Sequence, residues 1–122
     1  MLLQTLNTLA QGKAFEYKYA DSEELVVYPS DSDGQPQKKH AYIVTRFEQE
    51  IVRDRIRQAG TITVGASRDN PPAGSLGAAL KAQGCSPQVL SYLSAVLVFE
   101  QFCTEARQGN SIALRVNRVA TS

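Results

Sequence analysis

The chain has 122 residues, of which 43% are hydrophobic, and its formal net charge is +1. A chain of this length is most simply one domain that can bury a core of its own. No apolar run approaches the roughly 20 residues that span a bilayer, and the first residues lack the basic and apolar regions of a signal peptide. We therefore expect a cytoplasmic protein without a membrane segment.

The first forty residues predict an extension made of a helix, a β-hairpin and a polar linker. Leucines recur at helical spacing within Leu2–Leu9, and Gly12 is placed to end that helix. Ala14–Ala20 alternates aromatic with polar residues, and Glu24–Pro29 follows an acidic turn, so the two segments predict a hairpin. Ser30–His40 is polar, rich in turn formers and without periodicity, which is typical of a linker.

A helix and a short strand are expected next. Ala41–Gly60 has apolar residues at helical spacing among Arg, Glu and Asp, with Phe47 and Ile51 on the expected core face, and Gly60 is placed to end the helix. Thr61–Ala66 is short and rich in β-branched residues, which favours a strand.

The stretch Ser67–Leu90 is dense in proline and glycine, which suits either a ligand-cradling loop or the start of a helix-turn-helix. It contains neither a GxxxxGK nor a GxGxxG pattern, so we do not expect a specific nucleotide site. Asn70–Pro72 stops the strand, because proline suits neither a helix interior nor a central strand. Serine caps and a Ser-Pro start predict two helices, Ser75–Gln83 and Pro87–Phe102.

The segment Cys103–Val116 predicts two strands around a Gly-Asn turn. A two-residue loop would pair Arg107 with Ile112, and a three-residue loop would pair Ala106 with Ile112. The second register gathers the apolar residues on one face and puts Arg107 and Arg115 together on the other. We favour it, because a one-residue slip moves every side chain to the opposite face.

From residue 41 onward the expected order is helix, strand, helix, three-residue turn, helix and hairpin. This order resembles the winged helix-turn-helix superfamily, and the residues that carry the resemblance are Ser75–Gln83, Pro87–Phe102 and the hairpin. The resemblance implies an α+β protein with a winged helix-turn-helix domain over residues 41–118, preceded by the helix and β-hairpin extension of residues 1–40. Gln101 stands where such domains commonly have a glycine before the first wing strand.

The resemblance implies a small DNA-binding protein, either a transcriptional regulator or the DNA-reading part of a larger system. The third helix would enter the major groove of double-stranded DNA and the wing would contact the backbone. Since the third helix has no Arg or Lys, phosphate contacts would come from elsewhere and binding would need a homodimer or a larger protein assembly. The expected DNA contacts are Arg68, Lys81, Ser86, Gln88, Ser91, Tyr92, Arg107 and Arg115.

The alternative is a winged-helix module that binds protein and not DNA. Residues 1–43 hold four Lys or Arg against six Asp or Glu, and residues 44–122 hold nine against six. This basic bias is mild, and it permits DNA binding without requiring it. The continuous apolar run Val96–Phe99 also needs a cover. We favour the N-terminal hairpin as that cover over a second subunit.

No catalytic or metal-binding constellation is found in the sequence. The single histidine, His40, lies in a polar loop without a nucleophile or a base nearby in the sequence. Cys85 and Cys103 have neither CxxC nor Cys/His spacing, so we expect two reduced thiols. We therefore expect no enzymatic activity, no cofactor and no metal.

Overall fold

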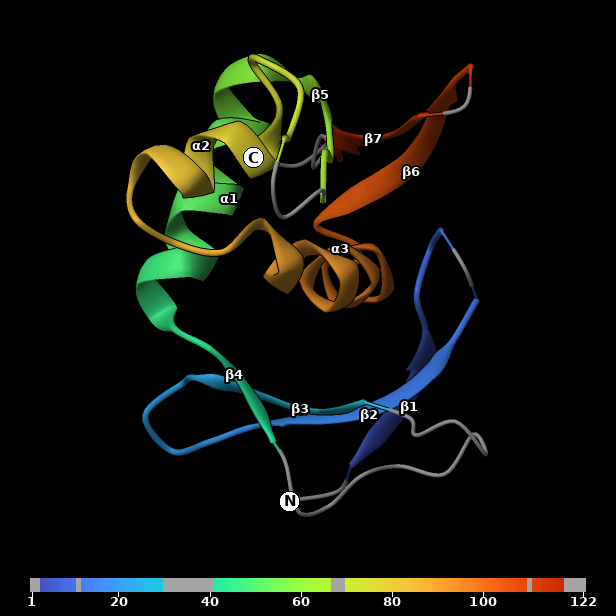
Figure 1. Cartoon of the computed structure of the whole chain (residues 1–122). Coiled ribbons are helices and arrows are strands. Elements are labelled where there is room, and N and C mark those ends of the chain that lie inside the picture. The colour runs from blue at the N-terminus through green and yellow to red at the C-terminus, as the bar shows by residue number, and fades with distance from the viewer. Residues whose placement is uncertain (1–2, 11, 30–40, 67–69, 110, 118–122) are drawn as a thin grey trace.

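The computed structural model describes residues 3–10, 12–29, 41–66, 70–109 and 111–117. These residues form an α+β structure with three α-helices and two antiparallel sheets (Figure 1). The first sheet has the order β1-β2-β3-β4, with strands Gln4–Asn7, Ala14–Tyr19, Leu25–Pro29 and Tyr42–Val44. The second has the order β5-β7-β6, with β5 at Thr61–Thr63, β6 at Cys103–Gln108 and β7 at Ser111–Val116. The helices are α1 (Arg46–Ala59), α2 (Leu76–Ala82), a 3-10 turn η1 (Pro87–Val89) and α3 (Leu90–Phe99).

The N-terminal segment is a strand, so the helix predicted there is wrong. Strand β1 pairs antiparallel with β2, and Leu6 lies opposite Phe15. Leu6 and Leu9 pack against the core while remaining partly exposed. A helix of one or two turns is marginal by itself in water, so pairing with β2 overrides the leucine spacing. The expected hairpin is present as β2 and β3, at the centre of this larger sheet.

The helix expected from Ala41 begins only at Arg46, because Tyr42–Val44 is strand β4 and pairs with β3. A capping box fixes the start of α1. Thr45 Oγ1 accepts from the Glu48 N–H at 3.1 Å, and Glu48 Oε1 accepts from the Thr45 N–H at 2.8 Å. Phe47, which the helical pattern assigned to the core, is 56% exposed.

The proline- and glycine-rich stretch brings the end of β5 against the start of α2. Ser75 caps α2, since its Oγ accepts from the Ala78 N–H at 3.1 Å. The Gly77 N–H donates to the Val64 carbonyl at 2.9 Å, so two backbones meet without a side chain between them. Residues 67–69 lie outside the described residues, and with them the predicted contact Arg68.

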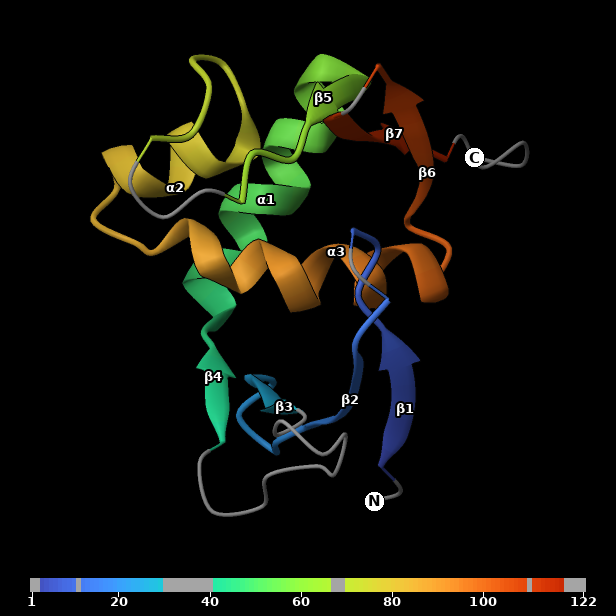
Figure 2. The same ribbon diagram turned by 45° about the vertical axis from the view of Figure 1, so that its right-hand side comes forward.

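The hairpin of β6 and β7 adopts the two-residue loop, so the register that we favoured is wrong. Arg107 lies opposite Ile112, and Arg115 lies opposite Thr104. Because side chains alternate along a strand, this register puts Arg107 and Arg115 on opposite faces. The face with Arg107 is turned toward the β1–β2 turn, where Arg107 Nη2 donates to the Leu9 carbonyl at 3.3 Å (Figure 2). The N-terminal segment thus supplies an acceptor that the hairpin pattern alone does not reveal.

Helix α3 ends at a residue with left-handed backbone that is not glycine. Gln101 has a φ of 65° and stands at the position where a glycine was expected. The Gln101 N–H donates to the Val98 carbonyl and the Phe102 N–H donates to the Leu97 carbonyl, each at 3.0 Å. These bonds close the last turn of the helix and direct the chain into β6.

Helix α3 occupies the centre of the molecule. In Figures 1 and 2 it runs between the four-stranded sheet on one side and α1, α2 and the three-stranded sheet on the other. Its residues Leu93–Leu97 are all buried, and one hydrophobic cluster contains side chains from both sides of the helix. Within the apolar run Val96–Phe99, Val96 and Leu97 are therefore covered within the same chain, whereas Phe99 remains 52% exposed.

Candidate functional site

The polar residues predicted to contact DNA at the start of α3 divide into two groups. Gln88 and Ser91 are exposed. Ser86 acts in the fold, because its Oγ accepts from the Gln88 N–H at 3.2 Å and caps η1. Tyr92 is half-buried, and its ring centroid lies 5.3 Å from that of Phe15 in an edge-to-face arrangement. Burial also raises the pKa of Tyr92, in keeping with a side chain that packs against the sheet.

The described basic residues predicted to contact phosphates do not form one surface. Lys81 is exposed in the last turn of α2, whose end lies near the start of α3 (Figure 2). Arg107 lies near the other end of α3, where its Nη2 is 3.1 Å from Glu105 Oε2 in addition to its bond to the Leu9 carbonyl. Arg115 is exposed on the opposite face of the hairpin. The structure therefore packs α2, which carries Lys81, against η1, which carries Gln88, and places Arg107 and Arg115 on opposite faces of the hairpin.

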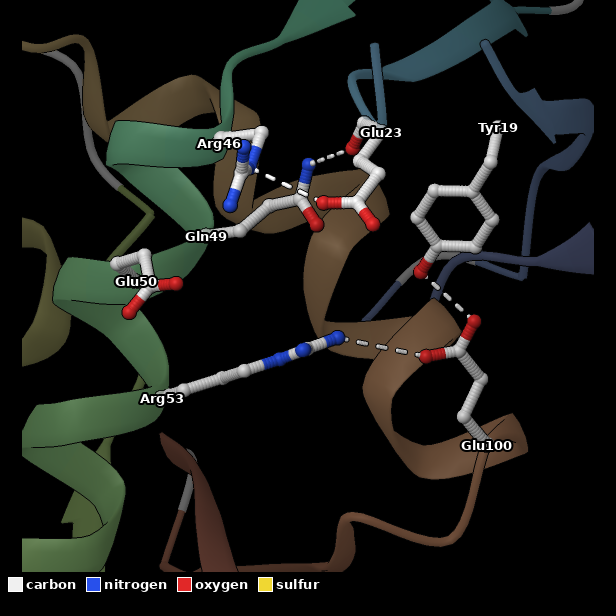
Figure 3. A pocket seen from close by; sticks show the side chains of 7 residues that line it. All are labelled: Tyr19, Glu23, Arg46, Gln49, Glu50, Arg53 and Glu100. Carbon is white, nitrogen blue, oxygen red and sulfur yellow. Dashed lines mark hydrogen bonds and ion pairs between the residues drawn. The ribbon is translucent and has the colours of Figure 1, made fainter. Parts of the chain in front are cut away.

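A polar pocket of about 390 Å³ lies at the seam between the four-stranded sheet, α1 and the end of α3 (Figure 3). It holds two arginines and three glutamates, so a ligand there would meet both signs of charge. The pocket is lined by Tyr19, Glu23, Arg46, Gln49, Glu50, Arg53 and Glu100.

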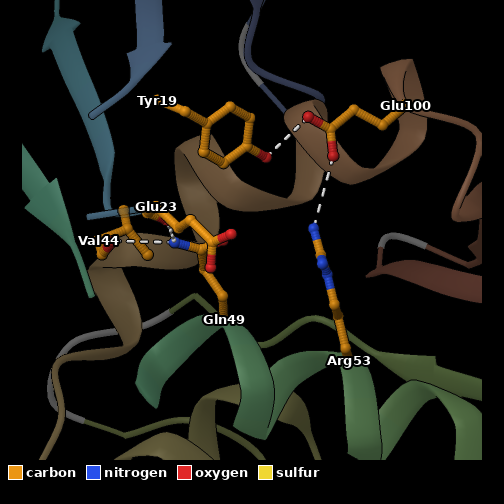
Figure 4. A network of polar contacts seen from close by, with 6 residues as sticks. All are labelled: Tyr19, Glu23, Val44, Gln49, Arg53 and Glu100. Carbon is orange, nitrogen blue, oxygen red and sulfur yellow. Dashed lines mark hydrogen bonds and ion pairs between the residues drawn. The ribbon is translucent and has the colours of Figure 1, made fainter. Parts of the chain in front are cut away.

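Glu100 joins three elements across this seam (Figure 4). Tyr19 Oη, from β2, donates to Glu100 Oε2 at 2.7 Å, and Arg53 Nη2, from α1, lies 3.5 Å from Glu100 Oε1. Burial raises the pKa of Tyr19, and the Glu100 carboxylate raises it further by accepting the phenolic hydrogen and by its charge. The phenol is therefore held as a proton donor, which ties the sheet to the end of α3.

A second group of contacts holds the β2–β3 turn against α1. Gln49 is buried, and its Nε2 donates to the carbonyls of Glu23 at 3.2 Å and Val44 at 3.1 Å. Arg46 Nε lies 3.2 Å from Glu23 Oε2, although both of these side chains are largely exposed. Glu23 has a φ of 70°, and these contacts hold it in this unfavourable conformation. The polar groups of the seam thus serve largely to hold the two halves together.

The seam pocket is lined by carboxylates, guanidinium groups, an amide and a phenol. Its phenol has a raised pKa and is a poor base at neutral pH, and its lining has no serine, cysteine or histidine. Among the described residues no group of His, Cys, Asp and Glu is arranged to hold a metal ion. This pocket could not be predicted from the sequence, because its residues come from three separate segments of the chain and share no motif.

The two thiols are poor nucleophiles. Cys103 is buried, and burial raises its pKa to about 11 even though Arg53 lowers it. Cys85 is half-buried, and its pKa is also raised, by burial and then by the charge of Glu48. Both thiols are therefore protonated at neutral pH.

An apolar groove of about 340 Å³ lies between α1 and α2. Phe47 stands four residues before Ile51, so it lies on the same side of α1, one turn nearer the start. Arg55, one turn further along, and Asp54 provide the charges of the groove. The lining residues are Ile51, Asp54, Arg55, Ala79, Ala82 and Gln83.

No family model matches the chain, and no curated protein or solved structure matches it either. No helix within the described part of the chain combines the length and the apolar character needed to cross a bilayer. The function must therefore be inferred from the geometry of the sites themselves.

Proposed function

We propose that this chain is a winged-helix interaction module that binds another protein and does not read DNA with its third helix. The observation that carries the proposal is the burial of Leu93–Leu97, a complete helical turn, between the two sheets. A recognition helix needs an exposed face to enter the major groove. In this chain the four-stranded sheet packs against α3 and leaves no such exposed face along Leu93–Leu97.

The arrangement from α1 to β7 supports the winged-helix interpretation. The elements follow the order helix, strand, helix, helix and two-stranded hairpin, as the resemblance implies. Strand β5 completes the sheet by pairing with β7, the second strand of the hairpin. The four-stranded sheet is an addition that packs on the third helix of this unit.

Separating the four-stranded sheet from α3 would expose buried apolar side chains at a large cost in free energy. Four of its apolar side chains are among the largest fully buried ones, namely Phe15, Leu25, Val27 and Val44. Exposing each would cost roughly 1.5–3 kcal/mol, so together they hold about 6–12 kcal/mol. That is comparable to the entire stability of a typical domain, roughly 5–15 kcal/mol. Opening the sheet to release α3 would therefore approach global unfolding.

The α1–α2 groove is the surface best suited to a protein partner. It is lined by Ile51, Ala79 and Ala82, and Phe47 beside it is one of the most exposed large hydrophobic residues in the described structure. Grooves of this kind accept the apolar face of an amphipathic helix. Asp54 is paired with Arg57 at 2.9 Å, so the charge of Arg55 favours a helix that carries an acidic residue next to its apolar stripe.

A DNA titration tests the negative half of the proposal. Mixed-sequence duplex is added to the folded protein at about 50 mM and about 200 mM salt, where phosphate contacts weaken steeply. We expect no binding at either salt concentration. Binding that is lost at the higher salt and weakened by Gln88→Ala would refute the proposal.

A peptide selection tests the positive half. Random peptides displayed on phage are selected on the intact protein and then measured individually as synthetic peptides. We expect selected peptides with apolar residues at helical spacing that bind Phe47→Ser at least tenfold more weakly, as the loss of a buried aromatic contact predicts. Phe99→Ser is the matched control, because Phe99 is 52% exposed and lies at the end of α3. Equal weakening by both variants would contradict the groove as the binding site.

DNA binding at the edge of α3 is the second candidate function. Gln88 in η1 and Ser91 in the first turn of α3 remain exposed, and Lys81 is exposed on α2, which packs against η1. Glutamine pairs with adenine, and lysine contacts phosphate. Such a site would contact DNA only through the N-terminal end of the helix. The same DNA titration tests it, since Gln88→Ala should then weaken binding.

A further inference from the structure

Strand β1 forms an open edge of the four-stranded sheet. It pairs with β2 on one side, and no strand among the described residues pairs with its other side. In Figure 2 it lies across α3 from α1 and α2, so this edge is separate from the α1–α2 groove. A free strand edge presents unpaired N–H and C=O groups, which is a template for another strand.

The backbone bonds of the sheet determine which groups of β1 face outward. The Thr8 N–H donates to the Lys13 carbonyl at 2.9 Å, which makes Thr8 and Lys13 a hydrogen-bonded pair in the register of β1 and β2. Hydrogen-bonded and non-hydrogen-bonded pairs alternate in an antiparallel ladder. Leu6 therefore bonds toward β2, while the backbone groups of Thr5 and Asn7 point away from the sheet.

The bond on the other side of β2 gives the same result. The Ala20 N–H donates to the Glu24 carbonyl at 2.9 Å, so the even-numbered residues of β2 bond toward β3. The odd-numbered residues of β2, such as Phe15 opposite Leu6, then bond toward β1.

This edge, although it has only four residues, carries neither a charged residue nor a proline to prevent strand addition. Residues 2–12 contain no charged residue and no proline. Lysine, proline, bulges and very short strands are the usual means of protecting an edge. The opposite edge, β4, has only three residues. Leu3, Leu6 and Leu9 are only partly buried and add apolar surface along β1.

We propose that β1 pairs antiparallel with β1 of a second copy of this chain, so that two sheets become one about a two-fold axis. A neutral strand meets its own copy without like-charge repulsion, and a two-fold axis makes the edge complementary to itself. The outward backbone N–H and C=O groups of Thr5 bond with those of the partner's Asn7. By symmetry, the groups of Asn7 bond with those of the partner's Thr5. This register places Leu6 opposite the partner's Leu6, on the side of the sheet that faces α3.

The first experiment measures association in solution. The protein, with any tag at its C-terminus, is studied by sedimentation equilibrium over a hundredfold range of concentration. We expect a reversible dimer. Thr5→Pro removes the outward N–H while leaving the bonds of Leu6 toward β2, and it should weaken dimerisation by about tenfold to a hundredfold. Thr5→Val retains the N–H and the strand propensity, so it should leave the dimer unchanged.

The second experiment tests the register. In a non-hydrogen-bonded antiparallel pair the Cα atoms lie about 4.5 Å apart, within the range of a disulfide. Leu6→Cys should therefore form a disulfide-linked dimer on mild oxidation, whereas Asn7→Cys, which faces the partner's Thr5, should form much less. A monomer at every concentration, or a dimer that Thr5→Pro leaves intact, would overturn the proposal. Neither result depends on DNA or peptide binding, so the proposed function stands or falls separately.

Discussion

Gly77 is the position where local propensity and tertiary packing predict opposite effects of one substitution. It lies in the first turn of α2, is buried and donates its N–H to the Val64 carbonyl at 2.9 Å. Alanine is favoured over glycine in helices by about 1 kcal/mol, so propensity alone predicts that Gly77→Ala stabilises the protein. A Cβ at this position, however, would overlap the Gly65 carbonyl oxygen and lie 2.9 Å from both the Gly65 carbonyl carbon and Pro71 Cβ.

The overlap cannot be relieved by rotating a side chain, because the nearest atoms belong to the backbone of Gly65. The start of α2 would have to move away from the end of β5. Overpacking of this kind typically costs about 1–3 kcal/mol, and loss of the buried bond to Val64 costs about 1–3 kcal/mol more. After the propensity gain of about 1 kcal/mol, we expect Gly77→Ala to destabilise the protein by roughly 1–5 kcal/mol.

Urea denaturation followed by circular dichroism measures this change directly, and the melting temperature should fall by roughly 3–6 °C for each kcal/mol of lost stability. Gly84→Ala is the control. Gly84 has a φ of 77° but open space around its Cα, so alanine there should cost only about 1–2 kcal/mol of backbone strain. If Gly77→Ala is as stable as the parent chain, the close approach of β5 and α2 does not exist as described.

Three further predictions follow from single contacts. Tyr19→Phe removes the 2.7 Å bond to Glu100 and should cost about 1 kcal/mol at pH 8. Because the pKa of Tyr19 is raised in the fold, its contribution is complete below its usual pKa of about 10 and is lost as the pH rises further. The difference in free energy of unfolding between the parent protein and Tyr19→Phe, measured in urea, should therefore be smaller at pH 11 than at pH 8. A larger difference at pH 11 would contradict a hydrogen bond from the Tyr19 phenol to Glu100. In a thiol titration at pH 8, Cys85 should react slowly in the native protein and Cys103 only after unfolding; native reactivity that persists in Cys85→Ser would show that Cys103 is accessible. Thr45→Ala should cost about 1 kcal/mol through loss of the capping box, and Thr45→Ser, measured alongside it, should restore the parent stability.

The second half of the chain was more predictable than the first because its boundaries depend on local chemistry. Ser75 and Ser86 were expected to cap helices, and both side chains accept the capping bonds in the structure. The Gly-Asn turn was also located correctly. Its register was not, because the choice depended on which face of the hairpin is covered. The acceptor for Arg107 is the carbonyl of Leu9, ninety-eight residues away in the sequence.

The N-terminal segment shows the limit of periodicity in short elements. Leucines within residues 2–9 fit a helix, but a four-residue strand and a helical turn bury the same few side chains. The strand is favoured over the helical turn because it pairs with the edge of β2 and covers the aromatic residues of that strand. The seam pocket was unpredictable for the same reason, since Tyr19 and Glu100 lie eighty-one residues apart.

The composition of α3 is that of a buried helix and not of a surface helix that could contact DNA. Its ten residues, LSYLSAVLVF, include no charged side chain, whereas a surface helix has one apolar and one polar face. A helix that is apolar on all sides requires cover on all sides. In this fold the three-stranded sheet and α1 lie on one side of α3, and β1, β2 and β3 lie on the other. The same sheet that removes α3 from the surface presents the unpaired edge of β1. The N-terminal sheet therefore both buries α3 and provides the strand edge at which we propose that a second copy pairs.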